Sequence, residues 1–320
     1  MFNYFVGIDI SKQYFDASVE VRGKTRHHKF SNSEKGFDSL FDWCNKLEIS
    51  NAHFCMEATG AFWIELATWL NKKELSVSVI NPACIKRFAQ SELKRNKTDK
   101  VDAGIISRFC KVMMPPLWVP PTPEVGRLQK LVRRRHDLGK MRQQERNRRS
   151  SLSLDEDTLA SVERSLKFID SELLRVDRKI DQLFKKFASL KEKRDLLLSI
   201  PGVGEMTANV VLSEVINIDM FDSPKQLAAF AGLAPREISS GNSIRGRTRI
   251  SKLGNSRLRT ILYLPSVTAR SCNPVIKEFC NRLLQNGKSP MKVVGAAMRK
   301  LLHIIYGVLK SGKPFSVCTN

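Results

Sequence analysis

Apolar and polar positions near the start of the chain alternate with the short period of β-strands. The runs YFVGIDI (residues 4–10), YFDASVEV (14–21) and TRHHKF (25–30) predict three strands joined by tight turns. Two more apolar runs, AHFCMEA (52–58) and LSVSVI (75–80), are separated by a segment with helical periodicity. Three antiparallel strands followed by helix–strand alternation predict a mixed sheet with helices on its faces.

A proline-rich segment, PPLWVPPTP, follows two further helical stretches. It cannot form a helix interior, because proline lacks the backbone N–H and its ring clashes with the preceding turn. We therefore expect a first α/β domain over residues 1–114 and a stiff linker over residues 115–123.

The segment after the linker changes from strongly basic to strongly amphipathic. We assign residues 124–195 to a basic helix followed by a coiled coil, because apolar residues recur there with alternating spacings of 3 and 4. These seam positions are Leu159, Val162, Leu166, Ile169, Leu173, Val176, Ile180, Leu183, Phe187 and Leu190. The seam needs a partner, which is either the basic helix folded back or a second copy of the chain. We favour a contribution to dimerisation.

Residues 196–320 read as a mainly α-helical C-terminal domain. The run Ile200-Pro201-Gly202-Val203-Gly204 lies between two helical stretches and resembles a helix-hairpin-helix loop. Its glycines would let backbone N–H groups approach a phosphate closely, without reading the base sequence. The alternative is a plain turn between two helices.

The net charge of the chain indicates which class of partner it binds. With 54 Lys and Arg against 32 Asp and Glu, the formal net charge is +22, which favours nucleic acid over a membrane. Residues 127–149 alone hold ten basic and two acidic side chains. The candidate nucleic-acid contacts are Arg133, Arg134, Arg135, Arg142, Arg146, Gly202, Gly204, Arg245, Arg247, Arg249, Lys252, Arg257 and Arg259.

Several other classes are disfavoured by the sequence. A hydrophobic content of 42% is ordinary for a folded protein, so wholesale disorder is not expected. No apolar run approaches the ~18 residues of a membrane span, and no signal-peptide pattern is evident. The seven cysteines are scattered without CxxC spacing, so we expect no cysteine zinc site and a reducing cytoplasm.

Four acids in the first domain stand out by their placement. Asp9 lies within the first strand, Glu57 ends the fourth, and Asp99 and Asp102 share one face of a helical segment. Four carboxylates gathered in one place would repel, and a pair of divalent cations is the natural compensation. Two metal ions about 4 Å apart are also a standard device of phosphodiester chemistry. We therefore expect Mg²⁺ or Mn²⁺, with two ions bound, although each acid alone could be an ordinary surface or helix-end charge.

Four motifs, in order along nearly the whole chain, carry a resemblance to a known family. They are GIDISKQYFD, MEATGAFW, KTDKVDA and GLAPREISSGNSIRGRTRISKLGN. Together they resemble the DEDD insertion-sequence transposases and the Piv-type DNA invertases. The resemblance implies a first domain of RuvC or ribonuclease-H type, a coiled-coil connection and a second transposase domain.

The resemblance also implies functional residues and partners. Asp9, Glu57, Asp99 and Asp102 would be the DEDD metal ligands, and a serine of the ISSG motif would be the nucleophile. Ser240 matches best, and Ser239 is the alternative because the doublet makes the register ambiguous by one residue. The implied partners are DNA, a structured guide RNA encoded by the element, and further copies of the chain in a homodimer or homotetramer.

The favoured function is therefore that of an insertion-sequence transposase, with a site-specific invertase as the alternative. Two other functional classes, a sugar kinase and a non-catalytic nucleic-acid-binding protein, fit the sequence less well. GIDIS superficially resembles the first phosphate loop of actin-like sugar kinases, but no second Asp-x-Gly motif follows it and the large positive charge has no role there. A non-catalytic nucleic-acid-binding protein is disfavoured because all four acids and the serine doublet are present.

Overall fold

The computed structural model describes residues 2–92, 99–150, 155–236, 239–240, 244–245 and 249–317. It divides into two compact units, Met1–Pro120 and Pro121–Asn320, each described here by itself. In the part of the chain that the structure describes, no helix is both long and apolar enough to cross a membrane.

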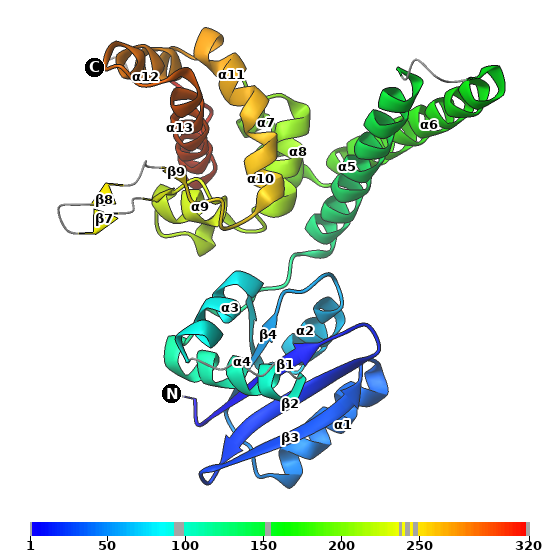
Figure 1. Ribbon diagram of the computed structural model, residues 1–320, viewed down its shortest axis with the longest axis vertical. Coiled ribbons are helices and arrows are strands. Elements are labelled where there is room, and N and C mark those ends of the chain that lie inside the picture. The colour runs from blue at the N-terminus through cyan, green and yellow to red at the C-terminus, as the bar shows by residue number, and fades with distance from the viewer. Residues whose placement is uncertain are drawn as a thin grey trace. The chain divides into compact units, whose positions relative to one another are not determined.

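The first unit contains a five-stranded mixed sheet, as the sequence pattern predicts (Figure 1). The strands have the spatial order β3-β2-β1-β4-β5; β2 is antiparallel to β1 and β3, whereas β1, β4 and β5 run parallel. Their bounds are β1 Tyr4–Ile10, β2 Tyr14–Val21, β3 Lys24–Ser31, β4 Ala52–Glu57 and β5 Ser76–Ile80.

Two pairs of helices cover the two faces of this sheet. Helices α1 (Glu34–Lys46) and α2 (Trp63–Lys72) share one apolar core with β1, β2 and β4. Helices α3 (Pro82–Ser91) and α4 (Asp99–Met113) share a second core with Cys55 of β4 and Ile80 of β5. The unit therefore has three layers.

Helix α4 approaches β1 closely at Gly7. A Cβ atom at residue 7 would lie 2.1 Å from the backbone nitrogen of Ser107 and 2.2 Å from the carbonyl oxygen of Ala103. The Ser107 hydroxyl donates a hydrogen bond of 2.7 Å to the Phe5 carbonyl. Helix α4 therefore runs antiparallel to β1, with Ser107 near Phe5 and the preceding turn near Gly7.

The start of the proline-rich segment packs on the first unit. The Ser78 hydroxyl lies within hydrogen-bonding distance of the Pro115 and Pro116 carbonyls, and the Trp118 backbone N–H donates to the Val77 carbonyl at 2.7 Å. The Trp118 ring also meets the Trp63 ring edge to face. The boundary between the units, after Pro120, falls inside the 115–123 segment.

The second unit begins with two long helices, α5 (Pro123–Arg149) and α6 (Glu156–Lys186), which pack along each other as a hairpin (Figure 1). The seam residues of α6 from Val162 to Leu183 are buried in the single chain. Within one chain the partner of the seam is therefore the basic helix α5, and the favoured contribution of this segment to dimerisation stays a prediction.

The seam also ends earlier than the heptad pattern suggests. Helix α6 stops at Lys186, and Phe187 adopts an extended conformation with φ −117° and ψ 100°. Leu190 belongs to the next helix, α7 (Ala188–Leu198), where it is buried in the main core.

Helices make up most of the rest of the second unit. They are α8 Glu205–Glu214, the 3₁₀ turn η1 Ile218–Met220, α9 Pro224–Phe230, α10 Ser256–Ile261, α11 Tyr263–Cys272, α12 Pro274–Gln285 and α13 Pro290–Ser311. Four two-residue strands form two small ladders, in which β6 Pro235–Arg236 pairs with β9 Arg249–Ile250 and β7 Ser239–Ser240 pairs with β8 Ile244–Arg245.

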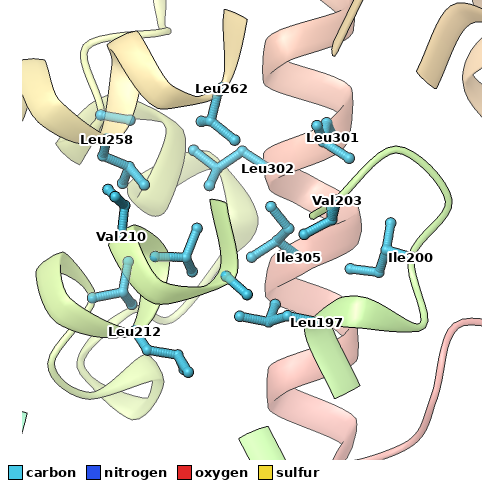
Figure 2. Close-up of a cluster of buried hydrophobic side chains, with 14 of the residues drawn as sticks. Leu197, Ile200, Val203, Val210, Leu212, Leu258, Leu262, Leu301, Leu302 and Ile305 are labelled. Atoms are coloured by element: carbon cyan, nitrogen blue, oxygen red, sulfur yellow. The ribbon is translucent and has the colours of Figure 1, made fainter. Parts of the chain in front are cut away.

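The core of this unit surrounds α13. Leu301, Leu302 and Ile305 of α13 lie among Leu197, Ile200 and Val203 of the α7–α8 segment (Figure 2). Gly202 has φ +96°, and a Cβ atom there would lie 2.8 Å from the Cβ of Ala269 on α11. The glycine is thus required by the close approach of α11 as well as by its backbone conformation.

The hairpin assignment predicts how the seam responds to a charge. Ile169 is 4% exposed, so Ile169→Asp buries an unpaired carboxylate and should lower the free energy of unfolding by about 3 kcal/mol or more. Leu174→Asp, on the same helix at a residue 59% exposed, should have little effect. Thermal melts at several protein concentrations provide the measurement. A destabilisation that vanishes at high concentration would show that the seam joins two chains instead.

The contact at Gly7 predicts a second contrast. Gly7→Ala forces α4 away from β1, because the clashing atoms are backbone, and should destabilise the first unit by about 2–3 kcal/mol. In Gly104→Ala, on α4 itself, the new Cβ meets only ordinary contacts of 3.6–3.7 Å, and the substitution should be neutral or stabilising by up to about 1 kcal/mol. Chemical denaturation measures both. Equal stability of the two variants would contradict the close packing of α4.

Candidate active site

Two of the predicted metal ligands lie side by side at the same end of the sheet. Strands β1 and β4 pair in parallel register as far as Ile8 opposite Met56. The next position on each strand brings Asp9 beside Glu57, at the strand spacing of about 4.8 Å. Both side chains are partly buried and lie on the face that carries Gly7 and Cys55, which is the face that α4 covers.

The other two acids lie in the first turn of α4. Because α4 runs antiparallel to β1, the turn that precedes Ala103 lies toward Asp9, one step along β1 from Gly7. Asp99 is one turn before Ala103, and Asp102 is partly buried beside it. The backbone thus directs Asp99 and Asp102 toward the end of the sheet that carries Asp9 and Glu57. The side chain of Asp99 lies outside the described residues.

The described side chains do not by themselves complete a metal site. Within the described ranges, no group of three or more His, Cys, Asp and Glu side chains is placed to hold an ion. Glu57 accepts a hydrogen bond of 2.6 Å from the Thr59 hydroxyl, which fixes one carboxylate oxygen. The convergence of all four acids on one ion pair stays a prediction.

A fifth carboxylate, which the sequence pattern did not single out, lies opposite Asp9. Asp16 on β2 is the antiparallel register partner of Asp9, so the two side chains lie on the same face. Asp16 is only 6% exposed, and its Oδ1 lies 2.8 Å from Nε2 of His27 on β3. Asp16 is the last residue of the GIDISKQYFD run, and nothing in its local spacing distinguishes it from an exposed strand acid.

The predicted nucleophile lies in the second unit, in the small β7–β8 ladder. Ser240 pairs with Ile244 in this ladder, and Ser239 pairs with Arg245. The side chains of these four residues lie outside the described residues, as does Arg247 altogether. The structure therefore does not distinguish Ser239 from Ser240.

The predicted basic contacts separate into two groups. In the first group, side chains bind other parts of the unit: Arg133 binds Glu214, Arg135 binds Asp177, Arg142 binds Asp170, and Arg259 donates to the Ala231 carbonyl. In the second group the side chains are exposed: Arg134, Arg146, Arg249, Lys252 and Arg257. The exposed group is the one that can bind phosphate without breaking an internal pair.

The two glycines of the PGVG turn also differ in what surrounds them. Gly202 packs against Ala269, whereas a Cβ atom at Gly204 would meet nothing within 4 Å. Gly204 is the residue before α8, so its neighbourhood includes the free N–H groups of a helix start. The structure shows a hairpin of α7 and α8, and its contact with DNA stays a prediction.

Comparison with known proteins follows the same two-part organisation. A DEDD family model described as "Transposase" matches residues 6–155, and a model described as "Transposase IS116/IS110/IS902 family" matches residues 194–281. The first match covers the acids, and the second covers the PGVG turn and the serine doublet.

Similarity to individual proteins extends along almost the entire chain. The "Pilin gene-inverting protein" of Moraxella lacunata is 33% identical over 314 residues, which are 97% of both chains. The protein of the same name from Moraxella bovis is equally similar. The "Transposase for insertion sequence element IS1111A" of Coxiella burnetii is 41% identical over 104 residues, which are 32% of this chain and 28% of that protein. The chain therefore belongs to the IS116/IS110/IS902 family of transposases, and it is a DNA recombinase.

Proposed function

We propose that this recombinase cuts and rejoins DNA with two sets of residues, one in each unit. The first set consists of the carboxylates Asp9, Glu57, Asp99 and Asp102, which hold divalent metal ions. The second is Ser240, or Ser239, which attacks the DNA phosphate. The observation that carries the proposal is the register of β1 and β4, which puts Asp9 beside Glu57 at the end of the sheet toward which α4 directs its first turn.

The donor set fits a hard divalent cation. All four side chains offer carboxylate oxygens, the ligands that Mg²⁺ and Mn²⁺ prefer. Asp9 and Glu57 repel at neighbouring strand positions, and Asp16 adds a third carboxylate on the same face. Bound metal would stabilise negative charge on the attacking and leaving oxygens of a phosphodiester. The Thr59 hydroxyl orients Glu57, and α4 holds Asp102 beside the sheet.

The serine conserves the energy of the DNA phosphodiester. Its Oγ forms a bond to phosphorus, the bond from phosphorus to one DNA oxygen breaks, the serine proton is lost and the leaving oxygen gains one. Attack by that DNA hydroxyl, or by another, reverses the step and rejoins strands without ATP. Arginines that follow the serine in the sequence, such as the exposed Arg249, would supply positive charge for the phosphate.

Because the acids and the serine belong to different units, catalysis requires the two units to meet. They can meet within one chain or between chains of an assembly. An assembly that completes the site only on DNA would prevent cutting by a lone chain. Self-association in a dimer or tetramer is therefore part of the proposal.

Transposition of an insertion element is the first candidate for the biological reaction. Site-specific inversion is the second, and it is favoured by the 33% identity over 97% of the chain to proteins named for inverting a pilin gene. The chemistry at the phosphate is the same in both. Sequencing the DNA that flanks the coding region distinguishes them: mobile-element ends indicate transposition, and an invertible segment indicates inversion.

A structured RNA partner also belongs to the proposal. It is implied by the resemblance to the DEDD transposases, and the net charge of +22 is compatible with a second polyanion. Sequencing of RNA that copurifies with the protein tests this point, and the absence of any enriched RNA from the element would remove it.

The carboxylate proposal predicts loss of cleavage and of metal binding together. Asp9→Asn and Glu57→Gln should each reduce Mg²⁺-dependent strand cleavage at least about 100-fold. They should also abolish the rise in melting temperature that saturating Mg²⁺ gives the wild type. Glu20→Gln, at an exposed position that pairs with Lys111 on the surface, is the matched control and should retain both properties. Full cleavage by wild type in excess chelator would contradict the proposal.

The serine proposal predicts a covalent protein–DNA adduct. Ser240→Ala should remove the adduct while leaving Mg²⁺ binding unchanged, because the serine and the acids lie in separate units. Ser239→Ala is the matched neighbour and should keep the adduct. Denaturing gel electrophoresis of labelled DNA provides the measurement. An adduct lost only in Ser239→Ala would assign the nucleophile to Ser239, and an adduct retained in both variants would exclude the serine mechanism.

A further inference from the structure

The second unit contains a groove of about 620 Å³ between α5, α8 and the α10–α11 segment. Its size lies within the ~300–1,000 Å³ of pockets that enclose small ligands. We call it the α5–α11 groove. Its described lining belongs entirely to the second unit and is therefore distinct from the four acids of the first unit.

Positive side chains line the groove from two sides. Arg133, Arg135, His136 and Lys140 come from α5, and Arg257 comes from α10. The acid in the lining, Glu214, is buried and already bound: Arg133 Nε lies 3.2 Å from its Oε1, and the Asn255 amide donates to its Oε2 at 2.7 Å. Arg135 is bound by Asp177 of α6. The charge of the single acid is therefore compensated before any ligand arrives.

Three cationic or titratable groups remain. Neither Lys140 nor Arg257 has an ion pair within the described ranges, and both are exposed. His136 lies one helical turn before Lys140 on α5 and lines the same groove as Arg257. Its pKa is lowered first by burial and then by the positive charges of Lys140 and Arg257. These effects exceed the opposing influence of Asp137 and Glu214 on that pKa. Two cations from different helices thus line one groove together with a partly buried imidazole, an arrangement that an anion would stabilise.

The groove also has an apolar side. Val132 and Val210 are buried in it, and Ile261 and Leu264 extend the same surface outward. Leu264 is 70% exposed, a large apolar side chain beside a cluster of cations. The described lining contains no Phe, Tyr or Trp, so an unpaired base would pack its flat face against these aliphatic side chains beside the cations rather than stack on an aromatic ring.

We propose that the α5–α11 groove binds a nucleotide of a single DNA strand, with the phosphate between Lys140, His136 and Arg257 and the base against Ile261 and Leu264. The choice of DNA rests on the proposed function, since DNA is the polymer on which a recombinase acts. A duplex does not fit the apolar side equally well, because its bases are stacked and paired inside the helix.

The test measures binding of a fluorescently labelled single strand to the full chain by anisotropy, in chelator so that no cleavage is needed. Lys140→Gln and Arg257→Gln should each weaken binding about tenfold. Each should also reduce the slope of log affinity against log salt concentration by about 0.7, because one phosphate contact on a single strand contributes about that much to the slope. Leu264→Ser should weaken binding about fivefold or more without changing the salt dependence. Thr260→Glu, which adds a negative charge at the groove, should weaken binding further.

Two matched controls lie on α6, away from the groove. Lys167→Gln removes one exposed positive charge, and Leu174→Ser removes one exposed leucine. Both should leave binding within about twofold of wild type. All six variants change exposed side chains, and thermal melts confirm that each is folded.

Three results would overturn the inference: groove variants that bind like the α6 controls, tighter groove-dependent binding of a duplex than of a single strand, or tighter groove-dependent binding of RNA than of DNA. The outcome is separable from that of the proposed function. If the protein cleaves DNA but its binding is unchanged by the groove variants, the proposed function stands and the groove inference fails. If binding depends on the groove but the protein never cleaves DNA, the groove inference stands and the proposed function fails.

Discussion

Helix α4 can lie against β1 only because residue 7 has no side chain. The backbone nitrogen of Ser107 and the carbonyl of Ala103 occupy the space where a Cβ would be. This contact fixes the height of the helix above the sheet and, with the Ser107–Phe5 hydrogen bond, its direction. Both are needed to bring the first turn of α4 toward the end of β1. The relation of the helical acids to the strand acids therefore depends on one glycine in a strand, a residue type that strands usually avoid.

The same packing concentrates negative charge. Asp9 has Glu57 as its neighbour on one side and Asp16 on the other, and all three share the face under α4. His27 binds Asp16, which reduces the repulsion on that side. Asp9 and Glu57 nevertheless lie at neighbouring, partly buried strand positions in a chain of net charge +22. Such a grouping of acids is understandable where they bind a cation.

The elements that the sequence predicted well are those determined by local periodicity. The five strands and the buried face of α6 follow from spacing within short windows. The partner of the seam could not be predicted in this way, because α5 and a second chain satisfy the same heptad pattern. The end of α6 before Phe187 could not be predicted either, because the apolar spacing continues past it to Leu190.

Site residues could be predicted where the period of their own strand or helix determines the face on which they lie. They could not be predicted where their surroundings depend on packing between segments that are far apart in the chain. Asp16 lies in a strand buried on both faces, because α4 covers the second face, so its burial is a tertiary effect. The pairing of Arg133 with Glu214 likewise cannot be predicted from local composition, because the two residues are 81 positions apart. The local sequence does not distinguish a basic side chain that binds an internal acid from one that binds a phosphate.

That distinction decides what the basic helix α5 can do. Like charges three and four residues apart on one helix repel, so a run with ten cations and two acids disfavours its own helix. Asp177 and Asp170 of α6 and Glu214 of α8 offset part of this repulsion and hold the helix to its neighbours. The cations left over, such as Arg134, Lys140 and Arg146, keep the residual repulsion in the free protein. In the proposed complex a polyanion would relieve this repulsion on binding, so the strain of an unbalanced helix would add to its affinity for nucleic acid.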